Sequence, residues 1–424
     1  MDVKRIKERL VLFFAVMGPG IITAFADNDA GGIATYSAAG AKYGYRLLFV
    51  LFISILVLTV VQEISARTGA VTGRGLSDLI RERYGVKWTF FAMSVLMVAN
   101  IGTTVSEFSG IATSFEIFGI SRYIAVPVIA FVVWRLVLKA NYSRIEKVFF
   151  ALCLTFFSYV ISGFIVGPPW REVITAAATP PTFSHDPGYL LMVIGIIGTT
   201  ITPWGQFYVQ ATIVDKGITA KTYAYTRWDV LVGAFFTGFI AFFIVVVTAA
   251  TLHVNNIPIE TAADAAIALE PLAGKYASFL FAFGLFGASM LAAFILPLST
   301  SYAICEAFGF ERGISKSYKE APVFFGLYTA IIVFSAVLVL WPGLSLYHVM
   351  LTTQVVNGIL LVPVLIFMVL IASNAKIMGK YRNSPLYNLV AWAFAGLIIV
   401  LTILLLAATV APGLVEQLFG RLGL

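Results

Sequence analysis

The chain has 424 residues, of which 60% are hydrophobic and 12% are charged, and its mean hydropathy is +0.94. This composition excludes an ordinary soluble globular protein and indicates an all-α, polytopic membrane protein. The formal net charge of +7 fits an excess of basic residues in the loops on one side of a membrane, so it does not indicate binding to nucleic acid.

Apolar stretches of roughly 20 residues, the length that a helix needs to cross the hydrocarbon, recur along the whole chain. We expect no soluble domain, so residues 1–424 should form one transmembrane domain that contacts the lipid bilayer. The longest connections should lie outside the cell. The eleven predicted spans are 10–40, 46–71, 88–118, 122–139, 145–167, 188–214, 228–252, 277–308, 322–341, 345–372 and 388–412.

The loops between these spans alternate in charge. Lys and Arg resist translocation, so the more basic loops are assigned to the cytoplasm. With an odd number of spans, we predict a cytoplasmic N-terminus and an external C-terminus, in a plasma membrane. Most of the 28 basic residues fall in the segments assigned to the inside, which are 4–9, 67–87, 135–147, 216–227, 312–319 and 376–382.

The first predicted span is interrupted near its middle, in the run from Gly18 to Gly32. Hydrocarbon offers a broken backbone no partners, so such a break survives only where protein or water satisfies the freed groups. Asp29 stands at the break and is our leading candidate for a cation ligand. Its alternative role is to cap a half-helix that we expect to begin near Ile33. Asp27 either faces the same aqueous cavity or hydrogen-bonds to the open backbone.

Other acidic residues also fall within predicted spans, where a charge costs about 2.5–3.5 kcal/mol at the helix centre. Glu63 lies four residues before Arg67 in the second span, and we interpret the two as an i, i+4 ion pair. Glu107 in the third span has no basic partner nearby in the sequence. It could line a vestibule, carry protons or form a buried hydrogen bond. Glu306 in the eighth span is expected to snorkel or to cap a helix.

A second break follows five spans after the first, around Pro203. Proline lacks an N–H and clashes with the carbonyl of the residue four positions earlier, so the oxygen of Thr199 is free to turn elsewhere. Thr202 adds a hydroxyl. Corresponding interruptions in the two halves of a chain are typical of transporters, whose substrate site lies between them. Gln354 in the tenth span either reaches an ion there or bonds to a neighbouring helix.

The sequence contains no pattern typical of catalysis. Its three histidines, His185, His253 and His348, lie in loops or at span ends without the spacing of metal ligands. Cys153 and Cys305 fall within predicted spans, where we expect them to be packing residues. We therefore predict neither an enzyme nor a resident cofactor.

At these residues the chain resembles the Nramp family of divalent-metal transporters, over nearly its whole length. The resemblance implies a LeuT-type fold with a metal ion held between spans 1 and 6. That fold consists of two inverted five-helix repeats, here 10–167 and 188–372, and an extra helix, here 388–412. The matching runs are Gly18 to Gly20, Asp29 to Thr35, Gln62 to Gly73, Glu107 to Gly110, Tyr302 to Phe308 and Gln354 to Val356.

The chain also departs from the family pattern. Members that carry Mn²⁺ and Fe²⁺ have Asp-Pro-Gly-Asn in span 1 and Met-Pro-His-Asn in span 6. Here Asp29 is kept, whereas Gly32, Thr202 and Trp204 replace the Asn, the Met and the His. A thioether favours transition metals, while hard oxygen ligands suit Mg²⁺, Ca²⁺ and Mn²⁺. The pattern resembles the Nramp-related magnesium transporter branch, and a short ligand shell leaves room for the waters that Mg²⁺ keeps.

The resemblance implies a ligand set and a mechanism. The carbonyls of Ala26 and Thr199 occupy positions that face the metal in the family. Proton coupling is expected to be weak, because Trp204 and Thr104 stand where the family has titratable groups. The metal-site prediction comprises Asp29, Thr202, Ala26, Thr199, Gly32 and Gln354, with Asp27 and Glu107 as accessory acids.

The sequence thus predicts import of Mg²⁺, with Mn²⁺ also accepted, by alternating access and without obligatory proton movement. One alternative is a proton-coupled Mn²⁺/Fe²⁺ importer of the same family. Another is a sodium-coupled amino-acid symporter of the same fold, but a pair of aspartates at the first break opposes an anionic substrate. The oligomeric state is not predicted.

Overall fold

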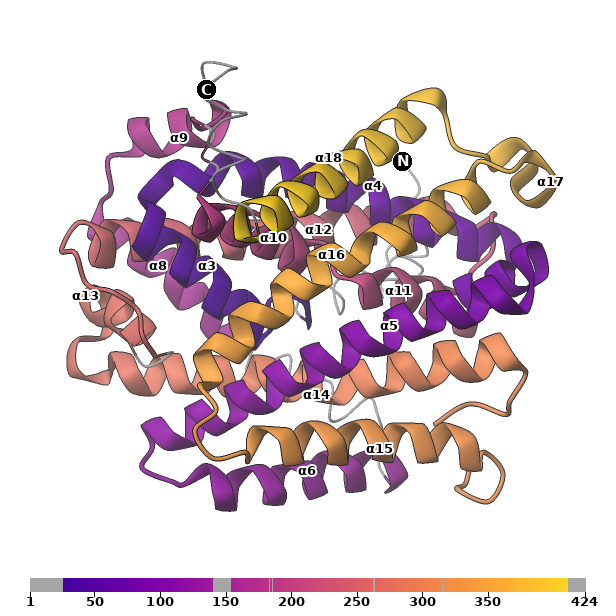
Figure 1. Cartoon of the computed structure of the whole chain (residues 1–424), viewed down its shortest axis with the longest axis horizontal. Coiled ribbons are helices and arrows are strands. Elements are labelled where there is room, and N and C mark those ends of the chain that lie inside the picture. Colours follow the sequence, from indigo (N-terminus) through magenta and orange to yellow (C-terminus); the bar gives the residue numbers. More distant parts are fainter. Residues whose placement is uncertain are drawn as a thin grey trace, which may run out of the picture.

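A computed structural model describes residues 26–139, 154–182, 184, 186–261, 264–314 and 316–410 (Figure 1). All regular elements in these ranges are helical. Gly18 to Gly20, Cys153, His185 and the beginnings of the first and fifth predicted spans lie outside them. The longer helices are α3 (Ala30–Tyr43), α4 (Leu48–Thr72), α5 (Leu76–Ile117), α6 (Arg122–Lys139), α8 (Phe157–Val166), α9 (Trp170–Ala178), α10 (Pro187–Thr200), α11 (Pro203–Asp215), α12 (Tyr223–Thr248), α14 (Ala277–Phe308), α15 (Pro322–Val339), α16 (Leu346–Ala372) and α18 (Pro385–Val410).

Short elements connect these helices. A π-helical turn follows α12 directly, and the two four-residue helices among them are each followed by a 3-10 turn. The connecting elements are η1 (Gly44–Leu47), η2 (Leu154–Phe156), η3 (Ala249–His253), η4 (Asp264–Leu269), α13 (Glu270–Ala273), η5 (Gly274–Tyr276), α17 (Ala375–Met378) and η6 (Gly379–Tyr381).

The predicted spans agree closely with the helices. Both α6 and α14 coincide with the spans predicted at 122–139 and 277–308. In the described part of the chain, eight helical stretches are long and apolar enough to cross a membrane, compared with eleven predicted spans. The difference arises because η1 joins α3 and α4 into one stretch, α6 carries three basic residues, and the fifth span is described only from 154 onward.

Helix α5 is longer than the predicted third span because it includes a further helical stretch before a kink. Gly85 has φ 78° and ψ 178°, values outside the helical region, and glycine tolerates positive φ because it lacks a Cβ. The residues after the kink correspond to the predicted span, while the helical turns from Leu76 to the kink were not predicted.

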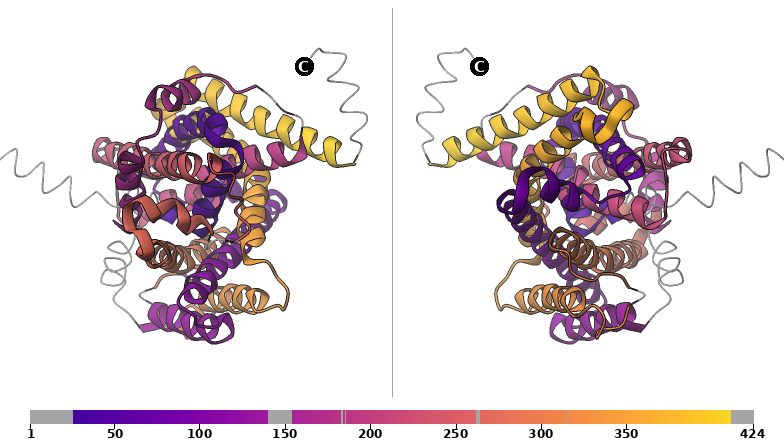
Figure 2. Two further views of the ribbon diagram at one scale, coloured as in Figure 1. Left: turned by 90° about the vertical axis from the view of Figure 1, so that its left-hand side faces the viewer. Right: turned by 90° about the vertical axis from the view of Figure 1, so that its right-hand side faces the viewer.

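The helices form a bundle in which α5 packs against α14 and α16, and α12 packs against α3 and α4. Figures 1 and 2 place α6 and α15 on one flank of the bundle and α18 on the opposite flank. Along the long axis, α9 and α13 lie at one end and α17 at the other (Figure 1). Basic side chains such as Arg74, Arg81 and Lys376 lie at the α17 end.

Candidate metal site

The first break lies where the sequence places it, at Asn28 and Asp29. Helix α3 begins at Ala30, three residues earlier than expected, and Asp29 is its N-cap. The Oδ1 atom of Asp29 accepts a hydrogen bond of 2.6 Å from the N–H of Gly32. Its Oδ2 atom is buried and has no hydrogen-bond partner in the described structure. Asp29 therefore caps the helix, and its second carboxylate oxygen stays open because the nearby side chains of Glu107 and Gln354 form no well-aligned hydrogen bond to it.

Glu107, from the middle of α5, faces this break. Its Oε2 accepts a 3.2 Å hydrogen bond from the N–H of Ala30, and its carboxyl also interacts with that of Asp29. Within the described ranges its Oε1 is buried without a partner. Glu107 is thus a buried, hydrogen-bonded carboxyl, which was one of the alternatives from the sequence. It also adds a second unsatisfied oxygen beside Asp29.

Asp27 makes side-chain contacts to two other spans. Its Oδ1 accepts a 3.0 Å hydrogen bond from the hydroxyl of Thr202, at the second break. Its Oδ2 accepts a longer bond of 3.4 Å from the amide of Gln62, in α4. Both partners are side chains, so neither bond is to open backbone, which was one of the two alternatives for Asp27.

The second break separates α10 from α11 at Ile201 and Thr202. Pro203 occupies the first position of α11, where its missing N–H costs nothing, and leaves the carbonyl of Thr199 without its usual helical donor. The hydroxyl of Thr199 is also buried without a well-formed hydrogen bond, although the side chain of Tyr36 lies near it. The hydroxyl oxygen of Thr199 is therefore open at this break, and its carbonyl oxygen lacks the donor that a continuous helix would supply.

The two breaks meet at Gly32. A Cβ atom on Gly32 would lie 3.1 Å from Thr199 Oγ1, 3.2 Å from Asp29 Oδ1 and 3.3 Å from the carbonyl oxygen of Asp27. A side chain there would have to displace these oxygens. Gly32 therefore lets the two breaks approach each other closely, and its N–H donates to Asp29.

Gln354 reaches the same region from α16. A Cβ on Gly31 would overlap its Nε2 atom, which is buried and lacks a partner among the described residues. Its Oε1 accepts a 2.9 Å hydrogen bond from Asn357, whose amide also donates to Thr103 at 2.9 Å. Gln354 is therefore bonded within its own helix and also lies beside the first break.

All the predicted site residues are closed off from solvent. Their exposed fractions are at most 1%, and Ala26 is buried at the start of the described range. In the described chain, no group of three or more His, Cys, Asp or Glu side chains is close enough to hold a metal ion. An ion at the breaks would instead need hydroxyl, amide, carbonyl and water oxygens in addition to the carboxylate of Asp29.

Several buried acceptors without partners near the two breaks are unusual, because buried polar atoms are nearly always hydrogen-bonded. Asp29 Oδ2, Glu107 Oε1 and Thr199 Oγ1 can all accept, and no described Lys or Arg side chain bonds to them. Such a group of oxygens fits a hard cation or the waters around one.

Sequence reasoning missed other buried polar groups. Asp229 in α12 is fully buried, although it was not among the acids noted within spans. Asn100 donates a 2.7 Å hydrogen bond to Thr300 and so links α5 to α14. Polar residues in apolar runs were the available signal, but the sequence does not indicate which helices they join.

The groups outside the breaks have local partners. His253 bonds through Nδ1 to the carbonyl of Ala41 at 2.9 Å, and His348 pairs with Ser345 at 2.8 Å.

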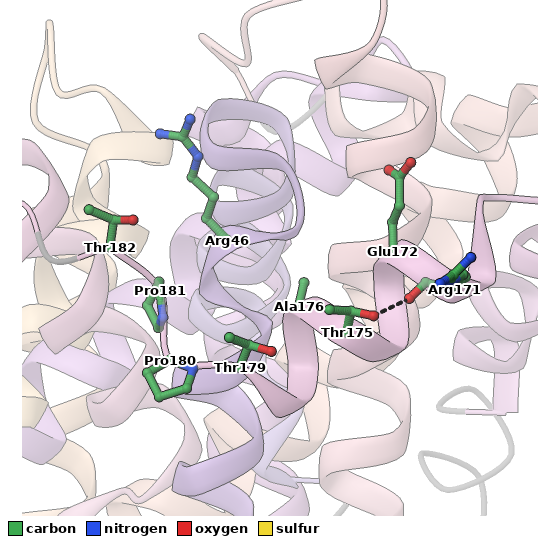
Figure 3. Close-up of a pocket in the computed structure, with 9 residues that line it drawn as sticks. All are labelled: Arg46, Arg171, Glu172, Thr175, Ala176, Thr179, Pro180, Pro181 and Thr182. Carbon is green, nitrogen blue, oxygen red and sulfur yellow. Dashed lines mark hydrogen bonds between the residues drawn. The ribbon is translucent and has the colours of Figure 1, made fainter.

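A cavity of about 910 Å³ lies at the α9 end, between Arg46 and the segment 171–182. Figure 3 shows its lining, where Thr175 donates to the carbonyl of Arg171 at 2.7 Å. This cavity is separate from the breaks.

Comparisons with known proteins agree on one family and one fold. The family described as Nramp, natural resistance-associated macrophage protein-like, matches residues 20–408. The divalent metal cation transporter MntH of Klebsiella pneumoniae is 27% identical over 399 residues, which is 91% of this chain and 92% of that protein.

Solved structures show the fold. A manganese transporter of Eremococcus coleocola superposes with a TM-score of 0.77 at 20% identity, covering 93% of this chain and 86% of the other. MhsT in complex with L-phenylalanine superposes with a TM-score of 0.59 at 15% identity, covering 92% and 98%. The fold is of the LeuT type, as predicted.

Proposed function

The chain belongs to the Nramp family of multi-pass membrane transporters for divalent metal ions, and on that premise we propose that it imports Mn²⁺ through the two breaks. The observation that carries the proposal is the closed group of open oxygens from Asp29, Glu107 and Thr199. Carboxylate, carbonyl and water oxygens suit Mn²⁺ as well as Mg²⁺ and Ca²⁺. The donor set alone therefore does not select among these three ions.

The comparisons favour Mn²⁺ over the Mg²⁺ preference expected from the sequence. A structural relative is described as a manganese transporter, and a sequence relative is described as a divalent metal cation transporter. The Mg²⁺ preference of the magnesium transporter branch has no support from them. Transport of Mg²⁺ remains a second candidate because of one observation. The donors at the breaks are oxygens, and Thr202 stands where importers of Mn²⁺ and Fe²⁺ carry a thioether.

The symporter alternative is disfavoured by the N-terminus of α3. An amino-acid substrate would place its carboxylate at exposed N–H groups of a half-helix. Here the N–H of Gly32 donates to Asp29, and the N–H of Ala30 donates to Glu107. Carboxylates of the protein already occupy this position. The site therefore favours transport of a cation over binding of an anionic substrate.

Coupling of metal transport to proton movement would need a group that can pass a proton to Glu107. Thr104 donates to the carbonyl of Asn100 at 2.7 Å, and Trp204 has no titratable group, so neither can pass a proton to Glu107. We therefore propose transport without obligatory proton movement. The proton-coupled alternative has one observation in its support, because Glu107 lies against Ala30 and Asp29, and two adjacent carboxyls can share a proton as well as a cation.

The repeat organisation and mechanism complete the proposal. We propose inverted repeats at 10–167 and 188–372, with 388–412 as the extra helix and the N-terminus in the cytoplasm. A site whose residues are at most 1% exposed can exchange ions only if helices move, which is consistent with alternating access. The carrier needs no catalytic group.

Uptake by the protein in liposomes tests the proposal. Internal dyes would report Mn²⁺, Mg²⁺ and Ca²⁺ separately, with and without a pH gradient. We expect Mn²⁺ uptake that saturates and competes with Mg²⁺. Uptake of Mg²⁺ alone would favour the second candidate, and uptake of none of the three ions would overturn the assignment to the breaks.

A further inference from the structure

The first break carries two carboxylates that are bonded differently. Asp29 has one bonded and one open oxygen. Asp27 has both oxygens bonded, to Thr202 at 3.0 Å and to Gln62 at 3.4 Å. Both acids are fully buried. Asp29 therefore has one oxygen that no donor occupies, whereas each oxygen of Asp27 already accepts one hydrogen bond.

The bond to Thr202 decides how that hydroxyl can act. A hydroxyl has one hydrogen and two lone pairs. Because Thr202 donates its hydrogen to Asp27, only lone pairs remain for anything else. Thr202 is also the N-cap residue of α11, yet its side chain makes no capping hydrogen bond in the described structure. A threonine at this position normally accepts from its own helix, so its orientation toward Asp27 needs another explanation.

We propose that Asp27 is a positioning residue, which fixes the Thr202 hydroxyl as an oxygen donor to the transported ion and joins the two breaks to each other. The inference rests on the proposed function, since Thr202 can be a ligand only if the ion binds between the breaks. It gives the second acid a role distinct from that of Asp29.

The chemistry of metal sites supports this role. A hydrogen bond from a hydroxyl to a carboxylate is charge-assisted and strong, and it increases the negative character of the donor oxygen. Groups that orient a ligand in this way typically contribute 10–100-fold to metal affinity. Without an acceptor at position 27, the hydroxyl hydrogen of Thr202 would be free to point at the cation, where it would repel it.

Gln62 supports Asp27 from the other side. Its Nε2 donates to the second carboxylate oxygen, and it comes from α4, outside both breaks. The Gln62, Asp27 and Thr202 side chains thus form one chain of bonds from α4 through the first break to the second. All three side chains are at most 1% exposed.

Substitutions at Asp27 separate positioning from direct ligation. In Asp27→Asn the amide oxygen can still accept from Thr202, and Gln62 can turn its amide to suit. In Asp27→Leu the acceptor is lost at similar volume. We would measure Mn²⁺ affinity of the full-length protein in detergent by calorimetry. We expect Asp27→Asn to stay within about threefold of the parent and Asp27→Leu to bind roughly 10–100-fold more weakly.

A double-mutant cycle tests whether Asp27 acts through Thr202. Thr202→Val should weaken binding about as much as Asp27→Leu, and the double variant should be no weaker than either single variant. Thr202→Ser should restore binding. Ser65→Ala, which removes another buried hydroxyl that donates to Gln206 at 3.2 Å, is the matched control and should bind normally.

Two results would overturn the inference. Equal losses in Asp27→Asn and Asp27→Leu would show that the charge of Asp27 binds the ion directly. Additive losses in the cycle would show that Asp27 does not act through Thr202. Asp27→Asn and Thr202→Ser preserve size and polarity, so they test the idea even if Asp27→Leu unfolds. Normal binding by Asp29→Asn would instead contradict the proposed function, whatever the outcome at Asp27.

Discussion

Two buried polar clusters lie next to each other on α4. One contains oxygens without hydrogen-bond partners, whereas the charges of the other are paired. Gln62 faces the breaks, where several oxygens are open. Glu63, the next residue, belongs to what we call the inner ion pair, Glu63 and Arg67, at 3.1 Å. Arg67 also donates to Asn383 at 2.6 Å and to the carbonyl of Tyr381.

The inner ion pair is fully satisfied by its neighbours. Tyr223 donates to Glu63, and the guanidinium of Arg67 lies 5.8 Å from the ring centre of Tyr387. Glu306 is a partly buried second case, because it accepts from the N–H of Gly75 at 3.1 Å and pairs with Arg312 at 3.1 Å. Paired buried charges hold helices together, whereas we propose that the open buried oxygens at the breaks bind a cation. The predictions below test this division.

The largest effect should follow Asp29→Asn. The substitution keeps the size of the side chain but removes the charge that offsets ion dehydration. We expect Mn²⁺ uptake to fall by more than about a hundredfold, beyond the typical cost of losing a group that only orients a ligand. Thermal unfolding should stay close to that of the parent. Near-normal uptake would contradict the ligand assignment, and Asp78→Asn, at an exposed acid of α5, serves as the control.

Arg67→Met should have the opposite signature. Removing one partner leaves Glu63 buried and unpaired, which typically costs 3–5 kcal/mol of stability. We expect a marked drop in the unfolding midpoint, while the protein that remains folded binds Mn²⁺ with an affinity within about threefold of the parent. Strong loss of affinity without loss of stability would place Arg67 in the ion site and break the division between the two clusters.

Thr202→Met should change selectivity at the breaks. A thioether favours softer transition metals over hard cations, so Cd²⁺ should compete better and Mg²⁺ worse, by about tenfold in the ratio of their inhibition constants. Competition against Mn²⁺ uptake measures this ratio. We would not add Asn at position 32, because a Cβ there would lie only 3.1 Å from Thr199 Oγ1. An unchanged ratio in a folded variant would place the ion elsewhere.

Proton movement should be small. The membrane potential contributes about 2.3 kcal/mol per charge per 100 mV, so a divalent cation gains roughly 4.6 kcal/mol without protons. We expect Mn²⁺ uptake to respond to voltage and to vary less than about twofold between mildly acidic and neutral external pH. Metal-driven acidification of the liposome interior that disappears in Glu107→Gln would support the proton-coupled alternative instead.

The smallest effect should follow Arg74→Ala. Arg74 lies 3.8 Å from Asp78 and also pairs with Glu82, but all three side chains are more than 40% exposed. Exposed ion pairs typically contribute at most about 1 kcal/mol. Both the unfolding midpoint and the Mn²⁺ affinity should therefore stay near those of the parent. A loss as large as that of Arg67→Met would show that burial does not separate the two classes of ion pair.

The sequence predicted the features that depend on local patterns. Apolar length located α6 and α14, Pro203 indicated the second break, and the four-residue spacing identified the pair of Glu63 and Arg67, which is confirmed. Glu306 was expected to cap a helix or snorkel, and it does cap one, but the helix is α5, far away in the sequence.

Contacts between distant spans could not be predicted in this way. Asp27 bonds to Thr202 and Gln62, and Asn357 bonds to Thr103, across 35 to 254 residues of chain. Their geometry depends on how the helices pack, and no local rule of propensity or spacing contains that information. The kink at Gly85 is different, because many glycines in the chain are helical and only the backbone shows which one turns.

An anomalous-scattering map at the manganese edge, from crystals of the protein soaked in Mn²⁺, tests the central claim most directly. We expect the strongest peak between the two breaks, within bonding distance of the open Oδ2 atom of Asp29, and no comparable peak at the inner ion pair. A strongest peak at another place in the protein, with none beside Asp29, would contradict the account.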